Sequence, residues 1–332
     1  MTHSPEERVG ESQEVRLGGT PQPRLTRPPD FDSFWKRTSA ELGRVASNVL
    51  REPLESQDPA LGFEGLTFAS WGEARVSGYV IRWKDTIPRP LVVHSHGYDG
   101  ELDPKWHWAR AAVNVIGVQT RGYGRSQGAL PSPSPWGYVV TGIGSPEEHF
   151  LRGAVCDYMR AVEVGKEIMG SLVSRTVLHG ASFAGGLALM AEAVMQVADF
   201  LVVAVPSFGW AEGRRLFVKE GSGQEINRYL EAHPEREEDV MVVLSYFDPM
   251  NFAVDVRCPT LVGLGVEDSV VPAPTVYAIA NHLGGLHQIV RLPVSHTDRP
   301  EEKLWEQFEV YWLRLAAEGV PPEFGERKEL SI

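Results

Sequence analysis

The sequence predicts an α/β fold with a mostly parallel central sheet and helices on both faces. From residue 90 onward, short apolar runs alternate with longer helical patterns, as expected for strands that helices cover on both sides. The chain has 332 residues, of which 42% are hydrophobic, and this is enough to bury such a sheet. It contains no internal repeat and no low-complexity tract, so neither a solenoid nor a disordered chain is indicated.

The N-terminal part of the chain predicts an extension ahead of the sheet. Residues 1–25 are polar and rich in proline and glycine, and we expect an N-terminal arm. An amphipathic helix is expected from residue 31 to about residue 50, with Asp30 as its N-cap. Two alternating strands are expected at 66–70 and 75–81, and the glycine-containing turn between them predicts an antiparallel pair.

The remaining elements follow from the alternation after residue 90. Short apolar strands are expected at 90–94, 113–119, 175–178, 200–205, 259–264 and 287–292. Helices are expected at 147–169, 185–196 and 300–317. Asp298 and Glu301 have the spacing of a capping box ahead of the last helix.

The segment 211–252 interrupts the alternation with charged helical sequence. We expect it to form a helical insertion near the active site, over the carboxyl ends of the strands, because α/β proteins bind ligands there. A single domain over residues 26–320 that carries this insertion fits the pattern better than two domains. Residues 321–332 are expected to form a C-terminal tail.

Composition excludes several classes of function. The formal net charge is −12, which argues against a nucleic-acid partner because such a surface needs a basic patch. No apolar run reaches the length of a membrane span, and the N-terminus lacks the apolar core of a signal peptide. Cys156 and Cys258 allow no disulfide framework, and both lie among apolar residues, so we expect buried thiols. The sequence thus predicts a cytoplasmic protein with no membrane partner.

One stretch carries the pattern of a catalytic nucleophile. The β-prone run from Thr176 ends in the small-residue string Gly180 to Gly186, which passes directly into a helical pattern. A serine on such a strand–turn–helix is exposed above the sheet at the N-terminus of the helix. Small residues are needed around it because the strand and helix backbones pass close together. The pattern predicts Ser182 as the nucleophile, although a serine in an ordinary strand–helix loop also fits the motif alone.

The chain also offers an acid and a base for this serine. α/β-hydrolases place their triad in the order serine, acid, histidine, each after a strand. Asp268 and His296 each follow one of the last two expected strands, and Glu267 competes with Asp268 for the role of the acid. Alone, either residue could be a turn or helix-leading polar group, but the ordered set predicts a Ser182–His296–Asp268 triad in an α/β-hydrolase fold. His179, just before the strand–helix turn that carries Ser182, is expected to be a core or supporting residue and not the base.

An oxyanion hole needs two backbone N–H donors near the serine. One comes from the residue after the nucleophile, Phe183, and the other from a loop that follows an early strand. The string His96-Gly97-Tyr98 supplies that loop, with Tyr98 as the donor. In other serine hydrolases the loss of one such donor lowers kcat by about 10²–10³.

Other polar and aromatic residues suggest a pocket and one rival chemistry. Pro206, Phe208 and Trp210 follow the end of a strand, and we expect them to bind substrate, although core packing is the commoner role of aromatic residues. His94 and His96 lie on one face of a strand as a candidate metal-ligand pair, but no further ligand motif accompanies them. We therefore expect no metal and no cofactor.

Strings along nearly the whole chain match one known pattern. They are Asp30 to Trp35, His96 to Tyr98, Arg121 to Ser126, Asp157 with Arg160 to Glu163, Gly180 to Gly186, Leu244 to Ala253, and Asp268 with Pro272 to Val276 and Asn281 to Leu283. They resemble the acetyl xylan esterase / cephalosporin C deacetylase family of α/β-hydrolases, carbohydrate esterase family 7. The resemblance favours Asp268 over Glu267 as the acid, and His296 matches the family's histidine.

This chain departs from the family's pattern at several positions. The glutamine after the nucleophile is Phe183, which we expect to keep the N–H donor but to add bulk beside the acyl site. The glutamine of the family's Arg-Gly-Gln-Gly motif is Tyr123, and the aspartate shortly before it is Gln119. The residue after the histidine is Thr297 where the family has glutamate. We expect the fold and triad to be retained and the substrate to differ, with Phe183 as the position that separates it from that of relatives.

The resemblance implies a serine esterase that hydrolyses short-chain acyl esters, typically acetyl groups on sugar hydroxyls, through an acyl-enzyme. It also implies a homo-oligomer, often a hexamer. Two alternatives remain open. One is a carboxylesterase, thioesterase or peptidase that acts on another acyl group with the same triad. The other is a non-catalytic α/β-hydrolase scaffold, against which the intact triad argues.

Overall fold

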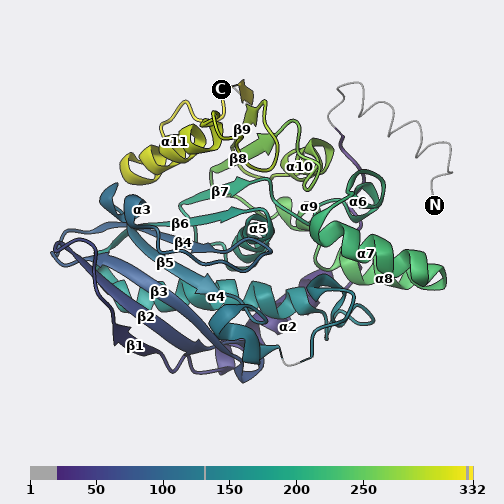
Figure 1. Cartoon of the computed structure of the whole chain (residues 1–332), viewed down its shortest axis with the longest axis horizontal. Helices are drawn as coiled ribbons and strands as arrows, with labels where there is room; N and C mark the ends of the chain where they lie inside the picture. The colour runs from purple at the N-terminus through teal and green to yellow at the C-terminus, as the bar shows by residue number, and fades with distance from the viewer. Residues whose placement is uncertain (1–20, 131, 327–328, 332) are drawn as a thin grey trace.

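The computed structural model describes residues 21–130, 132–326 and 329–331, so most of the expected N-terminal arm lies outside the described residues. Its strands form one mixed sheet (Figure 1). In chain order they are β1 (Leu50–Pro53), β2 (Leu61–Ala69), β3 (Arg75–Trp83), β4 (Arg89–Ser95), β5 (Asn114–Gln119), β6 (Val173–Ala181), β7 (Phe200–Ala204), β8 (Thr260–Gly265), β9 (His287–Leu292) and β10 (Glu329–Ser331). Their order in the sheet is β1-β2-β3-β5-β4-β6-β7-β8-β9-β10. The pairs β1/β2, β2/β3 and β3/β5 are antiparallel, and the pairs from β5/β4 to β9/β10 are parallel.

Helices cover both faces of this sheet because successive strand residues point to opposite sides. In β4, Leu91 and Val93 belong to one apolar core and Val92 to the other. The first core is closed by α2 (Phe31–Arg44), α4 (Phe150–Met169), α5 (Phe183–Met195) and α10 (Ala273–Ala280), the second by α3 (Trp106–Arg110) and α11 (Leu304–Glu318). The predicted α/β class with its mostly parallel sheet is confirmed. None of the helices within the described ranges is long and apolar enough to cross a membrane.

All strands predicted after residue 90 form, and the predicted antiparallel pair forms as β2 and β3, but both edge strands were missed. The first helix ends at Arg44, earlier than expected, and β1 begins at Leu50. The strand β10 lies in the segment expected to be a tail and pairs with β9. These strands have only four and three residues, and β1 is exposed along its length, so neither shows an apolar pattern.

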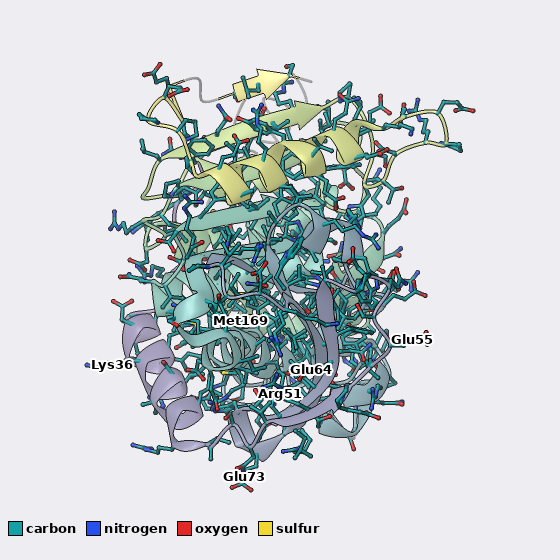
Figure 2. The ribbon with its side chains drawn as sticks, turned by 90° about the vertical axis from the view of Figure 1, so that its left-hand side faces the viewer. Lys36, Arg51, Glu55, Glu64, Glu73 and Met169 are labelled. Atoms are coloured by element: carbon teal, nitrogen blue, oxygen red, sulfur yellow. The ribbon has the colours of Figure 1, made fainter. Side chains whose placement is uncertain are left out.

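The edge strand β1 is held to β2 by a pair of charges. Arg51 Nε lies 2.6 Å from Glu64 Oε2, and Arg51 Nη2 lies 2.8 Å from Glu64 Oε1 (Figure 2). Pro53 has no N–H to offer to another strand. Charged side chains and proline are common on edge strands because they discourage pairing with a further strand. The sheet therefore ends at β1.

Between β7 and β8 the predicted insertion forms as four helices. They are α6 (Ala211–Phe217), α7 (Gly221–Ala232), α8 (Glu237–Ser245) and α9 (Pro249–Ala253), and Figure 1 shows α6 to α8 together at one side of the sheet. The carboxylate of Asp248 accepts the N–H groups of Trp210, Ala211 and Met250, each at 2.9 Å. Burial raises the pKa of Asp248 to about 6, although these donors act in the opposite direction. One buried carboxylate thus joins both ends of the insertion.

Two predicted helix caps differ from the structure. Asp30 is the N-cap residue of α2 but makes no side-chain capping bond, because its carboxylate accepts the hydroxyl of Tyr246. The last helix begins at Leu304 and not near residue 300, so Asp298 and Glu301 form no capping box. Asp298 instead accepts backbone N–H groups at the start of α11, at 3.1–3.2 Å. It therefore serves the helix from a loop and not from the N-cap position.

A buried ion pair connects the loop after β5 to α4. The i,i+3 spacing of Asp157 and Arg160 predicts that these two residues pair. In the structure Asp157 pairs with Arg121, at 2.9 Å from Nε and 2.7 Å from Nη2, while Arg160 pairs with Glu163 at 2.8 Å. The Asp157 side chain is fully buried, and it also accepts the backbone N–H of Arg121 at 2.9 Å.

Replacing Asp157 by alanine is expected to lower the free energy of unfolding by about 3–5 kcal/mol, because it leaves the Arg121 guanidinium buried without its counter-ion. The matched control is Asp239→Ala, which breaks the exposed i,i+3 pair with Arg236 and is expected to cost less than about 1 kcal/mol. Urea unfolding of both variants measures the difference. Equal losses in the free energy of unfolding would show that the buried pair of Asp157 and Arg121 stabilises the fold no more than an exposed pair does.

Candidate active site

Ser182 lies on the sharp turn between β6 and α5, with φ 54° and ψ −117°. A positive φ is strained for any residue other than glycine and is held here by the backbone around it. A Cβ on Gly180 would lie 2.1 Å from the carbonyl oxygen of Ala184, and one on Gly185 would lie 3.1 Å from the Cα of Pro206. These close approaches explain the small residues on both sides of the serine.

The structure brings Asp268 and His296 together. The first follows β8 and the second follows β9, and His296 Nδ1 lies 2.7 Å from Asp268 Oδ2. The Asp268 side chain is fully buried, and its other oxygen accepts the N–H groups of Val270 and Val271 at 2.8 Å. These donors fix the carboxylate so that it holds the imidazole in one orientation. Glu267, the competing acid, instead forms a surface ion pair with Arg299.

Ser182 and His296 line the same cavity, which has a volume of about 450 Å³. The Ser182 Oγ lies 3.3 Å from the Oγ of Ser207. The cavity is a pocket of the size that small-molecule ligands occupy. Its walls come from the loop after β4, the end of β6, the loop after β9 and helix α11. The candidate nucleophile and base therefore face a common space that can hold a substrate.

The two expected oxyanion donors, Phe183 and Tyr98, are sequence neighbours of residues that line this cavity. Phe183 is the first residue of α5, where a helix leaves backbone N–H groups without an internal partner. On the other side, Gly97 lines the cavity and His96 holds its loop. His96 Nε2 accepts the N–H of Thr120 at 3.0 Å, so Nδ1 carries the proton and donates to the Gly97 oxygen at 2.6 Å.

The hydroxyl of Tyr98 joins the early loop to the insertion. It donates to Glu225 Oε2 of α7 at 2.6 Å and accepts the N–H of Val139 at 3.0 Å. Burial raises the pKa of the Tyr98 hydroxyl well above its usual value, so it stays protonated and can donate. The insertion contributes no residue to the wall of the Ser182 cavity. The insertion therefore contacts the candidate active site through the loop of Tyr98, and it does not cover Ser182.

The ring of Phe183 lies in an aromatic cluster and is not among the side chains that line the Ser182 cavity. It is 1% exposed, and its centroid lies 5.7–6.0 Å from the rings of Tyr98, Tyr123, Phe150 and Phe208. Two departures from the family pattern, Phe183 and Tyr123, therefore belong to one packed group. The expectation that Phe183 adds bulk beside the acyl site stays a prediction.

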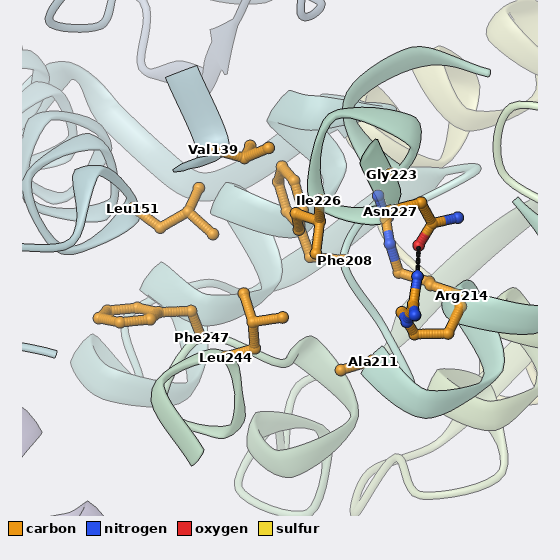
Figure 3. Close-up of a pocket in the computed structure, with 11 residues that line it drawn as sticks. Val139, Leu151, Phe208, Ala211, Arg214, Gly223, Ile226, Asn227, Leu244 and Phe247 are labelled. Atoms are coloured by element: carbon orange, nitrogen blue, oxygen red, sulfur yellow. Dashed lines mark hydrogen bonds between the residues drawn. The ribbon is translucent and has the colours of Figure 1, made fainter. Parts of the chain in front are cut away.

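Pro206, Phe208 and Trp210 do not lie on the wall of the Ser182 cavity. After β7 the chain turns behind α5, and a Cβ on Gly186 would lie only 2.7 Å from the Ser207 oxygen. Phe208 lines a separate void of about 20 Å³ in the insertion (Figure 3), with the guanidinium of Arg214 5.2 Å from its ring centroid. That volume holds about one water molecule. The prediction that these residues bind substrate is therefore not supported by their positions.

The sequence patterns did not point to several of the residues that line the cavity. They come from three separate segments and include Asp99, Glu101, His179, Trp305 and Trp312. The sequence held one signal for His179. It lies two residues before Ala181 on β6, so both side chains point to the same face of the sheet, next to the turn that carries Ser182. The contribution of α11 had no such signal, because it depends on how the last helix packs over the sheet.

The histidine pair on β4 has other partners. His94 Nε2 lies 2.6 Å from the hydroxyl of Tyr79, and His96 is bound as described above. Burial lowers the pKa of both imidazoles, so both rings are neutral. Among the residues that the structure describes, no group of three or more histidine, cysteine, aspartate or glutamate side chains could hold a metal ion.

Three features are those of an α/β-hydrolase. They are the strand order, the strained turn between β6 and α5, and the positions of Asp268 and His296 after successive parallel strands. A family model described as acetyl xylan esterase (AXE1) matches residues 19–314. The chain therefore belongs to the acetyl xylan esterase family and is a carboxylic ester hydrolase. The resemblance that the sequence motifs predicted is confirmed.

Individual relatives agree with this family. The acetyl esterase Axe7A of Xylanibacter ruminicola is 19% identical over 315 residues, which cover 90% of this chain and 70% of the relative. The solved acetyl xylan esterase from Paenibacillus sp. R4 has a TM-score of 0.80 at 23% identity and covers 89% of this chain and 97% of its own. Acetyl xylan esterase 1 from Thermoanaerobacterium sp. JW/SL YS485 has a TM-score of 0.79 at 23% identity, with 92% and 98% covered. The two structures share the fold.

Proposed function

We propose that this protein removes acetyl groups from the hydroxyls of sugars or similar small molecules, with Ser182, His296 and Asp268 as its catalytic triad. The observation that carries the proposal is the 2.7 Å contact between His296 and the buried Asp268 on the cavity that holds Ser182. Family membership supports the ester chemistry. The names of the relatives support acetyl as the acyl group.

In the proposed reaction His296 takes the proton of Ser182 as the Oγ attacks the ester carbonyl. Asp268 keeps the imidazole proton on Nδ1 and stabilises the charged ring that forms. The N–H groups of Phe183 and Tyr98 bind the oxyanion of the tetrahedral intermediate. His296 then protonates the leaving alcohol, and water releases acetate from Ser182. The site residues carry out these steps without a cofactor.

The packing around the elbow supports a short acyl group. The aromatic cluster around Phe183 packs at the start of α5, directly after Ser182, and leaves little room for a long acyl chain on that side. The cavity of about 450 Å³ lies on the α11 side and is large enough for the alcohol part of the ester. A sugar-sized carrier and a small acyl group fit this division.

Esters of one alcohol with acyl groups from acetyl to octanoyl test this proposal. We expect kcat/KM to be highest for acetyl and at least about tenfold lower for octanoyl, because a site of limited size discriminates by acyl length. The panel includes a thioester and an amide of acetate as controls. Faster hydrolysis of the octanoyl ester, the thioester or the amide would instead support a carboxylesterase, thioesterase or peptidase.

The remaining properties are proposals from the family resemblance and the chain itself. We propose a homo-oligomer, with a hexamer as the expected state, and a cytoplasmic location. The two cysteines are free thiols, Cys156 being buried, which suits a reducing compartment. Cephalosporin C deacetylation is an activity of the family that the same triad could perform. The departures at Phe183 and Tyr123 lie in the core, so they do not argue against cephalosporin C deacetylation, and a direct assay tests it.

A further inference from the structure

His179 occupies an unusual position in the candidate active site. It lies on β6, three residues before Ser182, and its side chain lines the same cavity as Ser182 and His296. Its ring centroid lies 4.7 Å from Trp108 and 4.6 Å from Trp312, so two indole rings fix its orientation. The residue is only 9% exposed. A histidine held in this way is rigid and adjoins the cavity.

The imidazole of His179 lacks the hydrogen bonds that other buried histidines make. Its Nδ1 is buried and has no partner among the described residues. His94 is bound to Tyr79, His96 to Gly97 and Thr120, and His149 to Val139, through their ring nitrogens. No ring nitrogen of His179 is thus held by another described residue, and because Nδ1 is sealed off, Nε2 is the nitrogen that a ligand in the cavity can reach.

The charge state of His179 limits what can bind to it. Burial, together with the nearby Lys105 ammonium, lowers the pKa of His179 to about 3. The ring is therefore neutral near pH 7 and offers one donor and one acceptor nitrogen. A hydroxyl group can donate and accept in the same way. The site is thus suited to a neutral hydroxyl.

The shape of the cavity indicates which part of the ester reaches His179. At about 450 Å³ the cavity is far larger than an acetyl group requires. The half-buried Trp305 of α11 lines it together with His179, so an apolar wall adjoins the polar ring edge. A sugar ring has apolar faces and hydroxyl groups at its edge. An apolar wall beside one neutral hydrogen-bonding group therefore complements a sugar ring.

We propose that His179 is a specificity-determining residue that binds a hydroxyl group of the alcohol part of the substrate, which is a neutral polyhydroxy ring. This inference rests on the proposed acetyl-ester hydrolysis and adds to it the residue that recognises the carrier. His179 does not take part in proton transfer to the ester. It acts by holding the ring that carries the ester next to Ser182.

The test compares two acetyl esters of similar ring size, a mono-acetylated xylopyranose and cyclohexyl acetate, which has no free hydroxyls. His179→Phe keeps a flat ring between Trp108 and Trp312 and removes both nitrogens. We expect kcat/KM for the sugar ester to fall about tenfold, mainly through KM, and kcat/KM for cyclohexyl acetate to stay within about twofold. His179→Gln, whose amide both donates and accepts, is expected to retain more of the sugar activity than His179→Phe.

Thermal unfolding separates recognition from a structural role. Because His179→Phe breaks no ring hydrogen bond within the described part of the chain, we expect its Tm to equal or exceed that of the wild type. An equal loss on both esters, no loss on either, or a fall in Tm of more than about 5 °C would overturn the inference. If the wild type cleaves cyclohexyl acetate but not the sugar ester, the carrier class is wrong while the esterase stands. If it cleaves neither, the proposed function itself fails.

Discussion

Replacing Ser182 by alanine is expected to lower kcat for acetyl-ester hydrolysis by about 10⁵-fold or more, as removal of a triad nucleophile does in other serine hydrolases. The serine lies on the strained turn at φ 54° with its Oγ in the cavity that His296 also lines. Without the Oγ no acyl-enzyme can form, and the oxyanion donors alone support only slow hydrolysis. Initial rates with a short acetyl ester measure the loss. A fluorophosphonate probe is expected to label the wild type but not this variant.

The matched control for Ser182 is Ser207. Its Oγ lies 3.3 Å from the Ser182 Oγ, and its N–H donates to the Ser182 carbonyl oxygen at 3.0 Å. Ser207→Ala removes a neighbouring hydroxyl of the same kind but leaves the elbow and the triad in place. We expect activity within about tenfold of the wild type and full labelling by the probe. If the probe labels Ser182→Ala but not Ser207→Ala, the nucleophile is Ser207 and our assignment of Ser182 is wrong.

Replacing Asp268 by asparagine is expected to lower kcat by about 10⁴-fold while the protein remains folded. The carboxylate accepts the Nδ1 proton of His296 at 2.7 Å, and an amide there can present its NH₂ group and favour the wrong tautomer. The amide oxygen can still accept the N–H groups of Val270 and Val271, so the loop is expected to persist. Steady-state kinetics together with Tm separate the loss of catalysis from a loss of folding.

Glu267 supplies the matched control for Asp268. It is the adjacent carboxylate, it competed for the same role in the sequence, and it forms an exposed ion pair with Arg299. Glu267→Gln is expected to change kcat less than about twofold, since an exposed pair contributes little. A large loss in Glu267→Gln with a small one in Asp268→Asn would reverse the assignment of the acid.

The sequence predicted the fold best where local patterns are strong. The buried parallel strands from β4 to β9 form continuous apolar runs because helices cover both of their faces, and the sequence predicts each of them. The edge strands β1 and β10 were missed because they are short and mostly exposed, and their pairing is decided by neighbours far along the chain. The capping box predicted before α11 does not form for a similar reason. The start of the helix at Leu304 is decided by its packing on the sheet and not by the local motif.

For the candidate site, the sequence by itself determined the triad candidates, the elbow and the family. These are local features: a backbone turn that tolerates only small neighbours, and polar residues that directly follow strands. The shape of the cavity was decided by the tertiary structure, which turned Phe183 into the core, placed Phe208 on another void and brought His179 beside Trp312. Side-chain direction at a strand end depends on which helix packs against it, and that information is spread over residues far apart in the chain.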